Sequence, residues 1–392
     1  MTSKKRALFI VHNYNSFQKD QIESVAHWFE VVYVLVRYNP LFRLFYYLTL
    51  TKFGRFNPSY TVDLHGKPPN IIVILTPVWY IPIDFFYNRL SGWHLESVIR
   101  AINKYNIKFD IIHAHFLWSA GNVGSKLKEL YKVPFVVTGH GYDVYTLPFK
   151  NKFWRDKITG AVKSADAITT PSKSNLNQLH DIGLSDRVSV IPNGYNKHLF
   201  YQKDKTDCRT LLKLPQHKHI IISVGNIEYV KGHNYLVEAM KIMEQGVDVL
   251  CFIIGSGSQT ASLRQQIKAL NLEKKVILLG AIKHEQIVNW MNAADLLVVP
   301  SVKESFGVVQ VEALACGLPV IATKNGGSEE IITEPSHGLL CEVKNSALLA
   351  QTIKDGLNRK WIQEDIMRYS LNFSWEILGR KFINIYQNLL QQ

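Results

Sequence analysis

The stretch that decides the fold is LLVVPSVKESFGVVQVEALACGLPVIAT, residues 296–323. It opens with Leu296–Val299, a short apolar run rich in β-branched residues that stops at a proline, as a buried strand does. Ser305 and Gly307 are cap and turn residues, and the apolar residues of 308–315 then predict a helix that ends at Gly-Leu-Pro. The stretch therefore predicts the strand, loop and helix that repeat in an α/β sheet.

This strand-to-helix junction is suited to bind an anion. The first N–H groups of a helix have no acceptor within the helix, and at 306–309 they would point toward a ligand together with the positive end of the helix dipole. A diphosphate would fit there. Glu304 lies in the loop and Glu312 lies farther along the helix, so the two carboxylates can contact different parts of one ligand. The plainer alternative is that Glu304 only caps the helix by its charge and Glu312 is solvated.

A second glycine turn follows the predicted strand 320–323 at Gly326-Gly327, and it predicts a second helix N-terminus. The pattern of Glu304, seven residues and Glu312, within Pro-Ser-x-x-Glu-Ser-Phe-Gly and followed by Gly-Leu-Pro-Val-Ile-Ala-Thr and Gly-Gly, resembles the family 4 glycosyltransferases. That family has the GT-B fold, in which two Rossmann-like, doubly wound α/β domains face an interdomain cleft. The resemblance extends over essentially the whole chain.

The resemblance implies roles for the residues of this stretch. Glu304 would lie beside the donor sugar and Glu312 would bind the ribose hydroxyls of a nucleotide-diphospho-sugar, with UDP or GDP as the nucleotide. The transferred sugar would keep its anomeric configuration. Four residues of the turn before the helix would bind the donor: Ser305, Phe306, Gly307 and Val308.

Three more donor positions come from the loops after earlier strands. Lys231 matches the lysine that pairs with a donor phosphate, although a surface lysine is more often only a solvated charge. Asn226 stands where the family has an arginine, so one cation is missing and Lys231 has more charge to offset. Gly255 belongs to a Gly-x-Gly turn that lies near the nucleotide in the family, and this turn alone is a weak signal.

Polar residues also follow two strands of the first half of the chain. His113 and His115 end one predicted strand, and His140 follows the next, at the strand ends where doubly wound sheets bind ligands. The resemblance implies that His140 contacts the donor sugar next to the acceptor, whereas a lone histidine is more often structural. The predicted catalytic residues are thus Glu304, His140 and Lys231. The first loop, 12–17, departs from the family because it lacks paired glycines.

A chain of 392 residues is too long for one ordinary core and predicts two α/β domains. We expect an acceptor-binding domain at 1–197 and a donor-binding domain at 198–372, with the polar segment 195–219 as linker. By resemblance, a last helix at 373–392 returns to the first domain. No signal peptide or membrane-spanning helix is predicted, and four cysteines without metal-ligand spacing indicate a cytoplasmic protein.

The positive charge is concentrated in the first half. Residues 1–198 hold 24 Lys+Arg and 13 Asp+Glu, a net +11, and residues 199–392 hold 21 and 19, a net +2. No nucleic-acid-binding motif is present, so nucleic acid is not expected as a partner. An anionic membrane surface suits this charge better, and the aromatic and basic stretch 39–56 could lie in its interface. The alternative for 39–56 is an ordinary amphipathic helix packed on its own domain.

The sequence therefore predicts a retaining hexosyltransferase. Its acceptor would be a hydroxyl of a lipid-linked glycan or surface polysaccharide precursor at the cytoplasmic face of the membrane. No Asp-x-Asp motif is present, so we expect no metal cofactor. Two rivals remain: a nucleotide-sugar epimerase of the same fold, and a catalytically silent subunit that binds a nucleotide or glycan. The sequence leaves open the sugar, the base, the acceptor, the linkage and the oligomeric state.

Overall fold

The computed structural model describes residues 5–41, 61–81, 84–183, 187–244 and 246–391. These residues form two compact units. Unit 1 comprises Met1–Asn193 and Trp375–Gln392, and unit 2 comprises Gly194–Ser374. Most of the stretch 39–56, for which the sequence leaves open a membrane interface or an ordinary amphipathic helix, lies outside the described residues. Within the described residues, no helix combines the length and the apolar character needed to cross a bilayer.

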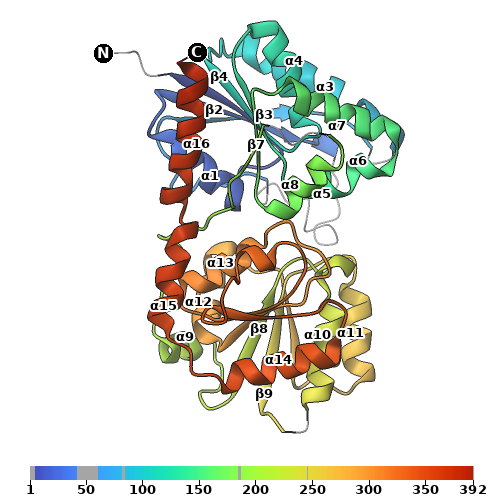
Figure 1. Cartoon of the computed structure of the whole chain (residues 1–392), viewed down its shortest axis with the longest axis vertical. Helices are drawn as coiled ribbons and strands as arrows, with labels where there is room; N and C mark the ends of the chain where they lie inside the picture. The colour runs from blue at the N-terminus through green and yellow to red at the C-terminus, as the bar shows by residue number, and fades with distance from the viewer. Residues whose placement is uncertain (1–4, 42–60, 82–83, 184–186, 245, 392) are drawn as a thin grey trace. The chain divides into compact units, whose positions relative to one another are not determined.

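The core of unit 1 is a parallel sheet whose described strands have the order β3-β2-β1-β4-β5-β6-β7 (Figure 1). The order changes direction between β1 and β4, which is the switch point where doubly wound sheets bind ligands. The strands are rich in Val and Ile because both of their faces are covered. They are β1 (Arg6–Val11), β2 (Val31–Tyr38), β3 (Ile71–Pro77), β4 (Ile111–His115), β5 (Phe135–Thr138), β6 (Ala167–Thr170) and β7 (Val188–Val190).

Helices cover both faces of this sheet. One face packs on α3, α4 and α7, and the other packs on α1 and α16, so unit 1 has two apolar layers. Polar side chains cap the starts of two helices. Asn151 accepts a hydrogen bond from the Trp154 N–H at the start of α7, and Ser172 accepts one from the Asn175 N–H at the start of α8. The helices are α1 (Ser16–Ala26), α3 (Asp84–Lys104), α4 (Ala120–Tyr131), α5 (Tyr142–Tyr145), α6 (Leu147–Lys150), α7 (Lys152–Ser164), α8 (Lys173–His180) and α16 (Trp375–Leu390).

Unit 2 repeats the plan with a parallel sheet of order β10-β9-β8-β11-β12-β13. Its switch point lies between β8 and β11, and β11 is the strand predicted at Leu296–Val299. The strands are β8 (His219–Val224), β9 (Val249–Ile254), β10 (Val276–Gly280), β11 (Leu296–Val299), β12 (Val320–Thr323) and β13 (Gly338–Cys341). Both units therefore have the doubly wound α/β architecture that the sequence predicts.

One face of the unit 2 sheet packs on α12, α13 and α15, and the other packs on α10, α11 and α14. The predicted linker 195–219 is wrong as a linker, because α9 lies within it and packs on α12. The helices are α9 (Lys205–Leu211), α10 (His233–Met243), α11 (Thr260–Ala269), α12 (His284–Ala293), α13 (Val308–Ala315), α14 (Ser346–Asn358) and α15 (Gln363–Ser370). Short 3₁₀ turns are η3 (Tyr229–Lys231), η4 (Ser328–Glu330) and η5 (Leu371–Phe373).

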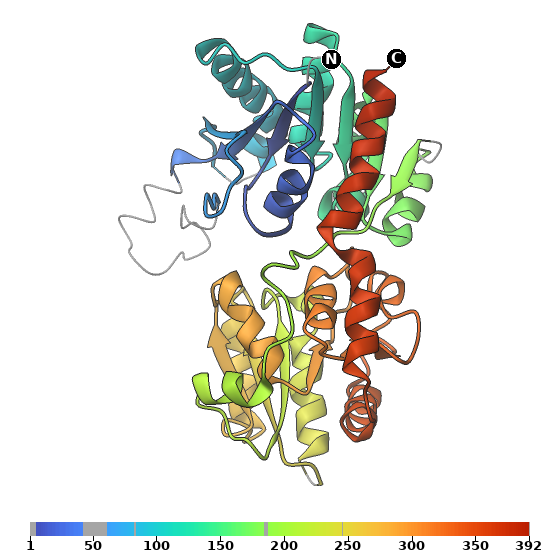
Figure 2. The same ribbon diagram turned by 90° about the vertical axis from the view of Figure 1, so that its left-hand side faces the viewer.

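The last helix, α16, is part of unit 1, where it packs beside α1 (Figure 2). Its buried Tyr386 lies with the hydroxyl 2.7 Å from Nδ1 of His113 in β4. The other ring nitrogen of His113, Nε2, lies 2.7 Å from the hydroxyl of Thr138 in β5. Through His113, two hydrogen bonds thus connect the last helix to two central strands of the sheet.

We predict that Tyr386→Phe destabilises unit 1 by about 1–3 kcal/mol, because His113 Nδ1 then remains buried without a partner. Thermal unfolding of the variant and the parent measures this change. Tyr105→Phe is the matched control, since Tyr105 is exposed and should change little. Equal melting temperatures for the parent and Tyr386→Phe would show that this hydrogen bond does not stabilise the fold.

Candidate functional site

In unit 2, the loops at the carboxyl ends of β8, β9 and β11 pack on one another without side chains between them. A Cβ at Gly255 would lie 1.9 Å from the carbonyl oxygen of Gly225, and a Cβ at Gly232 would lie 2.0 Å from that of Pro300. Both glycines have positive φ, of +145° and +66°. Glycine is therefore required at these two positions, and the backbones of the three loops come together at one edge of the sheet.

Lys231 and Glu304 meet at this edge. Lys231 Nζ lies 2.5 Å from Glu304 Oε1, which also accepts a hydrogen bond of 2.8 Å from the hydroxyl of Ser301. The Glu304 carboxylate is buried, whereas the Lys231 side chain is about 29 % exposed. A buried carboxylate is stable when it has a counter-charge and hydrogen bonds, and this one has both. Glu304 is therefore more than a solvated charge near a helix start, because its carboxylate is buried and paired.

The predicted anion turn has the expected backbone. α13 begins at Val308, after Gly307 with φ of +91°. Within the described residues, no acceptor lies within hydrogen-bond distance of the N–H groups of 306–309. Gly327 packs against this turn, and a Cβ at that position would lie 2.8 Å from the Phe306 nitrogen. These N–H groups follow Glu304 by two to five residues in the chain, so we expect an anion bound there to lie near the Lys231–Glu304 pair.

The second predicted helix N-terminus, after Gly326-Gly327, is wrong. Only the single 3₁₀ turn η4 forms there. Asn325 Oδ1 accepts the N–H groups of Gly327 and Ser328, at 3.1 and 3.0 Å, and the Glu329 carboxylate accepts that of Gly326 at 2.9 Å. Since nearby side chains already satisfy these donors, this turn offers none of them to a diphosphate, and its role is to pack Gly327 against Phe306.

Glu312 is buried on α13, so the alternative of a solvated helical residue is also wrong. Its Oε1 lies 2.7 Å from Nε2 of His284, the first residue of α12. The ring of His284 also packs against Phe200. No sequence pattern indicates a role for His284, because its proximity to Glu312 arises only when α12 and α13 pack on the same face of the sheet.

The remaining predicted donor residues are close to this edge. Asn226 has an exposed side chain in the loop after β8, and the N–H of its neighbour Ile227 donates to the Ser256 carbonyl at 3.1 Å. The N–H of Gly255 donates to the carbonyl of Gly280 at 2.8 Å. The structure thus places the predicted donor residues in unit 2, where Lys231 and Glu304 are in contact, and it places His140 in unit 1.

His140 belongs to a buried histidine cluster at the carboxyl edge of the unit 1 sheet. Its Nε2 lies 3.2 Å from Nδ1 of His115, and the two rings stack. The carboxylate of Asp143 accepts the N–H groups of His140, Gly141 and Leu117, which fixes the loops after β4 and β5. The pKa of Asp143 is raised, because the effect of burial is larger than the opposing effect of these N–H groups.

Burial lowers the pKa of both His140 and His113 to about 3. It also lowers the pKa of His12, which stacks on Phe116, and that of His115 well below the usual value. At neutral pH these imidazoles are uncharged, so each can offer or accept a hydrogen bond without carrying a charge. Sequence reasoning singled out His140, His113 and His115 but missed His12, whose only signal was its position after the first strand.

Comparison with known proteins matches each unit to a glycosyltransferase model. Residues 204–372 match the model of glycosyl transferases group 1, and residues 25–199 match that of glycosyltransferase family 4. An uncharacterized glycosyltransferase of Methanocaldococcus jannaschii is 32 % identical over 286 residues, which are 71 % of this chain and 76 % of the relative. The chain is a family 4 glycosyltransferase.

Solved structures show that this glycosyltransferase has the GT-B fold. Sucrose-phosphate synthase from Thermosynechococcus elongatus superposes with a TM-score of 0.80 at 23 % identity and covers 99 % of this chain and 100 % of its own. The HepE protein of Anabaena, in complex with UDP-glucose, superposes with a TM-score of 0.74 at 20 % identity, covering 98 % and 100 %.

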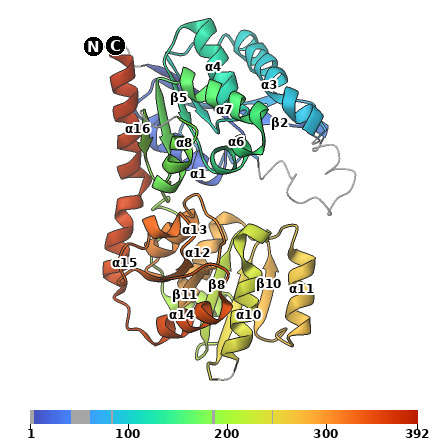
Figure 3. The same ribbon diagram turned by 45° about the vertical axis from the view of Figure 1, so that its right-hand side comes forward.

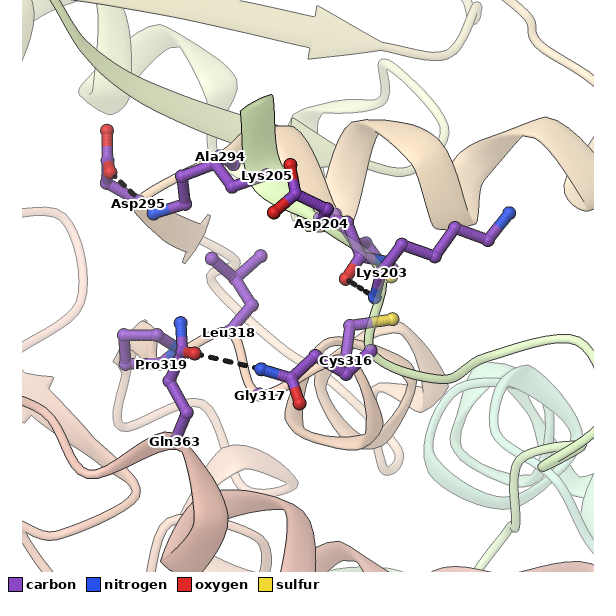
Figure 4. A pocket seen from close by; sticks show the side chains of 13 residues that line it. Lys203, Asp204, Lys205, Ala294, Asp295, Cys316, Gly317, Leu318, Pro319 and Gln363 are labelled. Atoms are coloured by element: carbon purple, nitrogen blue, oxygen red, sulfur yellow. Dashed lines mark hydrogen bonds and ion pairs between the residues drawn. The ribbon is translucent and has the colours of Figure 1, made fainter. Parts of the chain in front are cut away.

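A pocket of about 460 Å³ in unit 2 of the transferase is a different site (Figure 4). It lies where β11 and β12 begin, next to Asp295 and Pro319, so it is at the opposite edge of the sheet from Glu304. Its polar groups bind one another: Lys205 pairs with Asp295 at 2.9 Å, and Gln202 donates to Gln363 at 3.0 Å. Because these polar side chains already have partners within the protein, they do not by themselves indicate a ligand.

The buried histidines predict a specific pH dependence. A histidine with a folded pKa near 3 and an unfolded pKa near 6.5 stays neutral in the fold but binds a proton when unfolded between these values. The contribution of each to stability is complete above pH 6.5 and falls by about 1.4 kcal/mol per pH unit as the pH drops toward 3.

We therefore predict that the melting temperature falls as the pH drops below 6.5, and that His140→Gln makes this fall shallower. Melting curves from pH 7.5 to 4.5 test it. His180→Gln, at an exposed position of α8, should keep the slope of the parent. A slope that His140→Gln leaves unchanged would mean that His140 is not a neutral buried histidine in solution.

Proposed function

We propose that this glycosyltransferase is a retaining hexosyltransferase whose unit 2 binds a nucleotide-diphospho-sugar. The observation that carries the proposal is the set of acceptor-free N–H groups at 306–309 beside the Lys231–Glu304 pair. A diphosphate matches these donors in charge and in hydrogen bonding. The diphosphate would accept the free N–H groups, and the donor sugar would lie toward Glu304.

The same groups can stabilise the leaving diphosphate. Negative charge develops on its bridging oxygen as the bond to the sugar breaks, and fixed N–H dipoles aimed at that charge lower the barrier without having to reorganise. Lys231 is held by Glu304 before the donor binds, so its ammonium is already in place and its flexible stem lets it turn toward a phosphate. No step of this scheme assigns a role to a metal ion.

Glu304 would orient the donor sugar. Oε1 of Glu304 accepts hydrogen bonds from Lys231 and Ser301. Its Oε2 would accept a hydrogen bond from a hydroxyl group of the sugar. Glu312, fixed by His284, would accept the ribose hydroxyls, as the family resemblance implies. The acceptor hydroxyl would attack the anomeric carbon on the face from which the diphosphate leaves, which gives retention.

Unit 1 would bind the acceptor. His140 is uncharged at neutral pH and is fixed by Asp143, so it can bind a hydroxyl near the reacting carbon without adding charge there. We propose a lipid-linked glycan or surface polysaccharide precursor as the acceptor and a cytoplasmic enzyme at the membrane surface. The net charge of +11 in residues 1–198 supports attraction to anionic lipid. The UDP-glucose complex of HepE supports UDP as the donor nucleotide.

We predict that the product keeps the anomeric configuration of the donor and that Glu304→Ala lowers kcat by at least 100-fold, because the sugar loses its orienting carboxylate. Proton NMR of the product gives the configuration, and initial rates give kcat. Glu273→Ala, at an exposed position of unit 2, should keep the rate of the parent. An inverted product would refute retention, and conversion of the donor in the absence of an acceptor would indicate an epimerase instead.

A donor that binds unit 2 should also raise its melting temperature. We expect about 2.7 kcal/mol of added stability at a hundred times the dissociation constant, and a smaller gain in Lys231→Ala. Melting curves with UDP-, GDP- and unsubstituted sugars measure the effect. Lys268→Ala, exposed on α11, is the matched control. Donor binding without any transfer to a glycan acceptor would favour the silent binding subunit, for which Asn226 in place of the arginine is the supporting observation.

A further inference from the structure

Arg37 is a cation at the carboxyl end of β2 that has no carboxylate partner among the residues that the structure describes. It is the penultimate residue of that strand, in a parallel sheet where it pairs in register with Thr76 of β3. Its Nη1 donates a hydrogen bond of 2.8 Å to the hydroxyl of Ser119, which directly precedes α4. Its guanidinium carbon lies 5.9 Å from the centre of the Tyr80 ring. Among the described residues, no Asp or Glu forms an ion pair with Arg37.

Several partly buried cations of unit 1 have a carboxylate partner, although Lys67 binds only the carbonyl oxygens of Pro68 and Ile71 among the described residues. Lys19 pairs with Asp63 at 2.8 Å, Lys128 pairs with Asp166 at 2.6 Å, and Arg6 lies 3.6 Å from Asp110. All three are partly buried cations, as Arg37 is. A half-buried guanidinium that donates to one hydroxyl group and lies against one aromatic ring loses hydration without gaining an opposite charge. A bound anion would supply that charge.

Neutral hydrogen-bonding groups surround Arg37. His94 of α3 is fully buried, and its Nδ1 lies 3.1 Å from the same Ser119 hydroxyl that Arg37 contacts. Nε2 of His94 and the hydroxyl of Thr76 are buried and have no hydrogen-bond partner. The helices α3 and α4, which frame this group, pack together on one face of the sheet (Figure 3). The cluster therefore combines one unpaired positive charge with unused polar atoms that are nine-tenths buried or more.

The positive charge of Arg37 contributes to the lowered pKa values of His94 and His12. Burial is the largest cause of the lowered pKa of His94, and the Arg37 charge is the next. The same two causes, in the same order, lower the pKa of His12 in the loop after β1. Both rings stay neutral, so they can share an anion with Arg37 without competing with it for positive charge.

We propose that Arg37, Ser119 and His94 form an anion subsite that binds a phosphate or carboxylate group of the acceptor. The subsite lies at the carboxyl edge of β2, one strand from the β1–β4 switch point, where ligands of doubly wound sheets bind. The fork of N–H groups of an arginine matches the paired oxygens of both anions. The subsite thereby selects acceptors that carry a negative charge over neutral sugars. This inference rests on the proposed function only in assigning the acceptor to unit 1.

Binding of small anions tests the subsite without any transfer reaction. The probes are sn-glycerol 3-phosphate, L-malate and glycerol, added to the whole chain, and the dissociation constants are measured by calorimetry and by the shift in melting temperature. We expect one or both of the anions to bind and glycerol not to bind. Arg37→Gln should weaken the binding of these anions by about 10- to 100-fold, the range for a lost hydrogen bond to a charged group.

Two control variants separate the subsite from general basic charge and from misfolding. Arg100→Gln removes an exposed arginine of α3 and should bind the anions as the parent does. Ser119→Ala keeps the charge but removes the hydroxyl that holds Nη1, and we expect a smaller loss of affinity than in Arg37→Gln. Melting of each variant without probe shows whether it folds.

Two outcomes would overturn the subsite: equal affinity of the parent and Arg37→Gln for the anions, or no more binding of either anion than of glycerol. UDP binding to unit 2 is measured on the same samples and is expected to be unchanged in Arg37→Gln. If the parent does not bind UDP, this counts against the proposed function alone, because the anion titration does not depend on a donor. A shift produced by malate but not by glycerol 3-phosphate would identify the anion as a carboxylate, and the reverse would identify a phosphate.

Discussion

The site in unit 2 depends on direct backbone contact between loops. At Gly232, Gly255 and Gly327 a carbon atom added to the backbone would lie within 3 Å of a carbonyl oxygen or an amide nitrogen of the neighbouring loop. Such contact leaves no room for side-chain adjustment, so the loops after β8, β9, β11 and β12 form one rigid surface. Lys231 and Glu304 come from two of these loops and meet only because the loops are this close. The free N–H groups of the turn at 306–309 are held in place by the same packing.

Rigid packing of this kind would suit the proposed transfer, whose chemistry is mostly electrostatic. Transfer from a diphosphate leaves little covalent work for the protein, and what matters is that donors point in advance at the oxygen on which charge develops. Backbone N–H groups fixed at a helix start meet this need better than flexible side chains do. Under the proposed function, one cation, Lys231, could suffice where the resemblance expects a second at Asn226, since the N–H groups would supply part of the positive field.

Unit 1 uses a different means of keeping polar groups inside. Its strand ends carry imidazoles that burial holds neutral, bound to hydroxyl groups, to one another and to the Asp143 loop. Neutral groups cost less to bury than charges, so several can share one edge of the sheet. Arg37 differs from these imidazoles because it is a permanent charge that forms no ion pair with any described carboxylate, and this is the basis of the proposed anion subsite.

The sequence by itself determined the fold class, since short β-branched runs that alternate with helical segments can only bury both faces of their strands in a parallel sheet. It also determined the strand β11, the helix α13 and the turn between them, because caps, glycines and apolar spacing act locally. Only the tertiary structure decided that Lys231 binds Glu304 and that His284 binds Glu312, because the members of each pair are far apart in the sequence. It also decided that no described carboxylate reaches Arg37. It also decided that the turn at Gly326-Gly327 opens no helix: whether N–H groups are free depends on which side chains fold back on them, and Asn325 and Glu329 do so here.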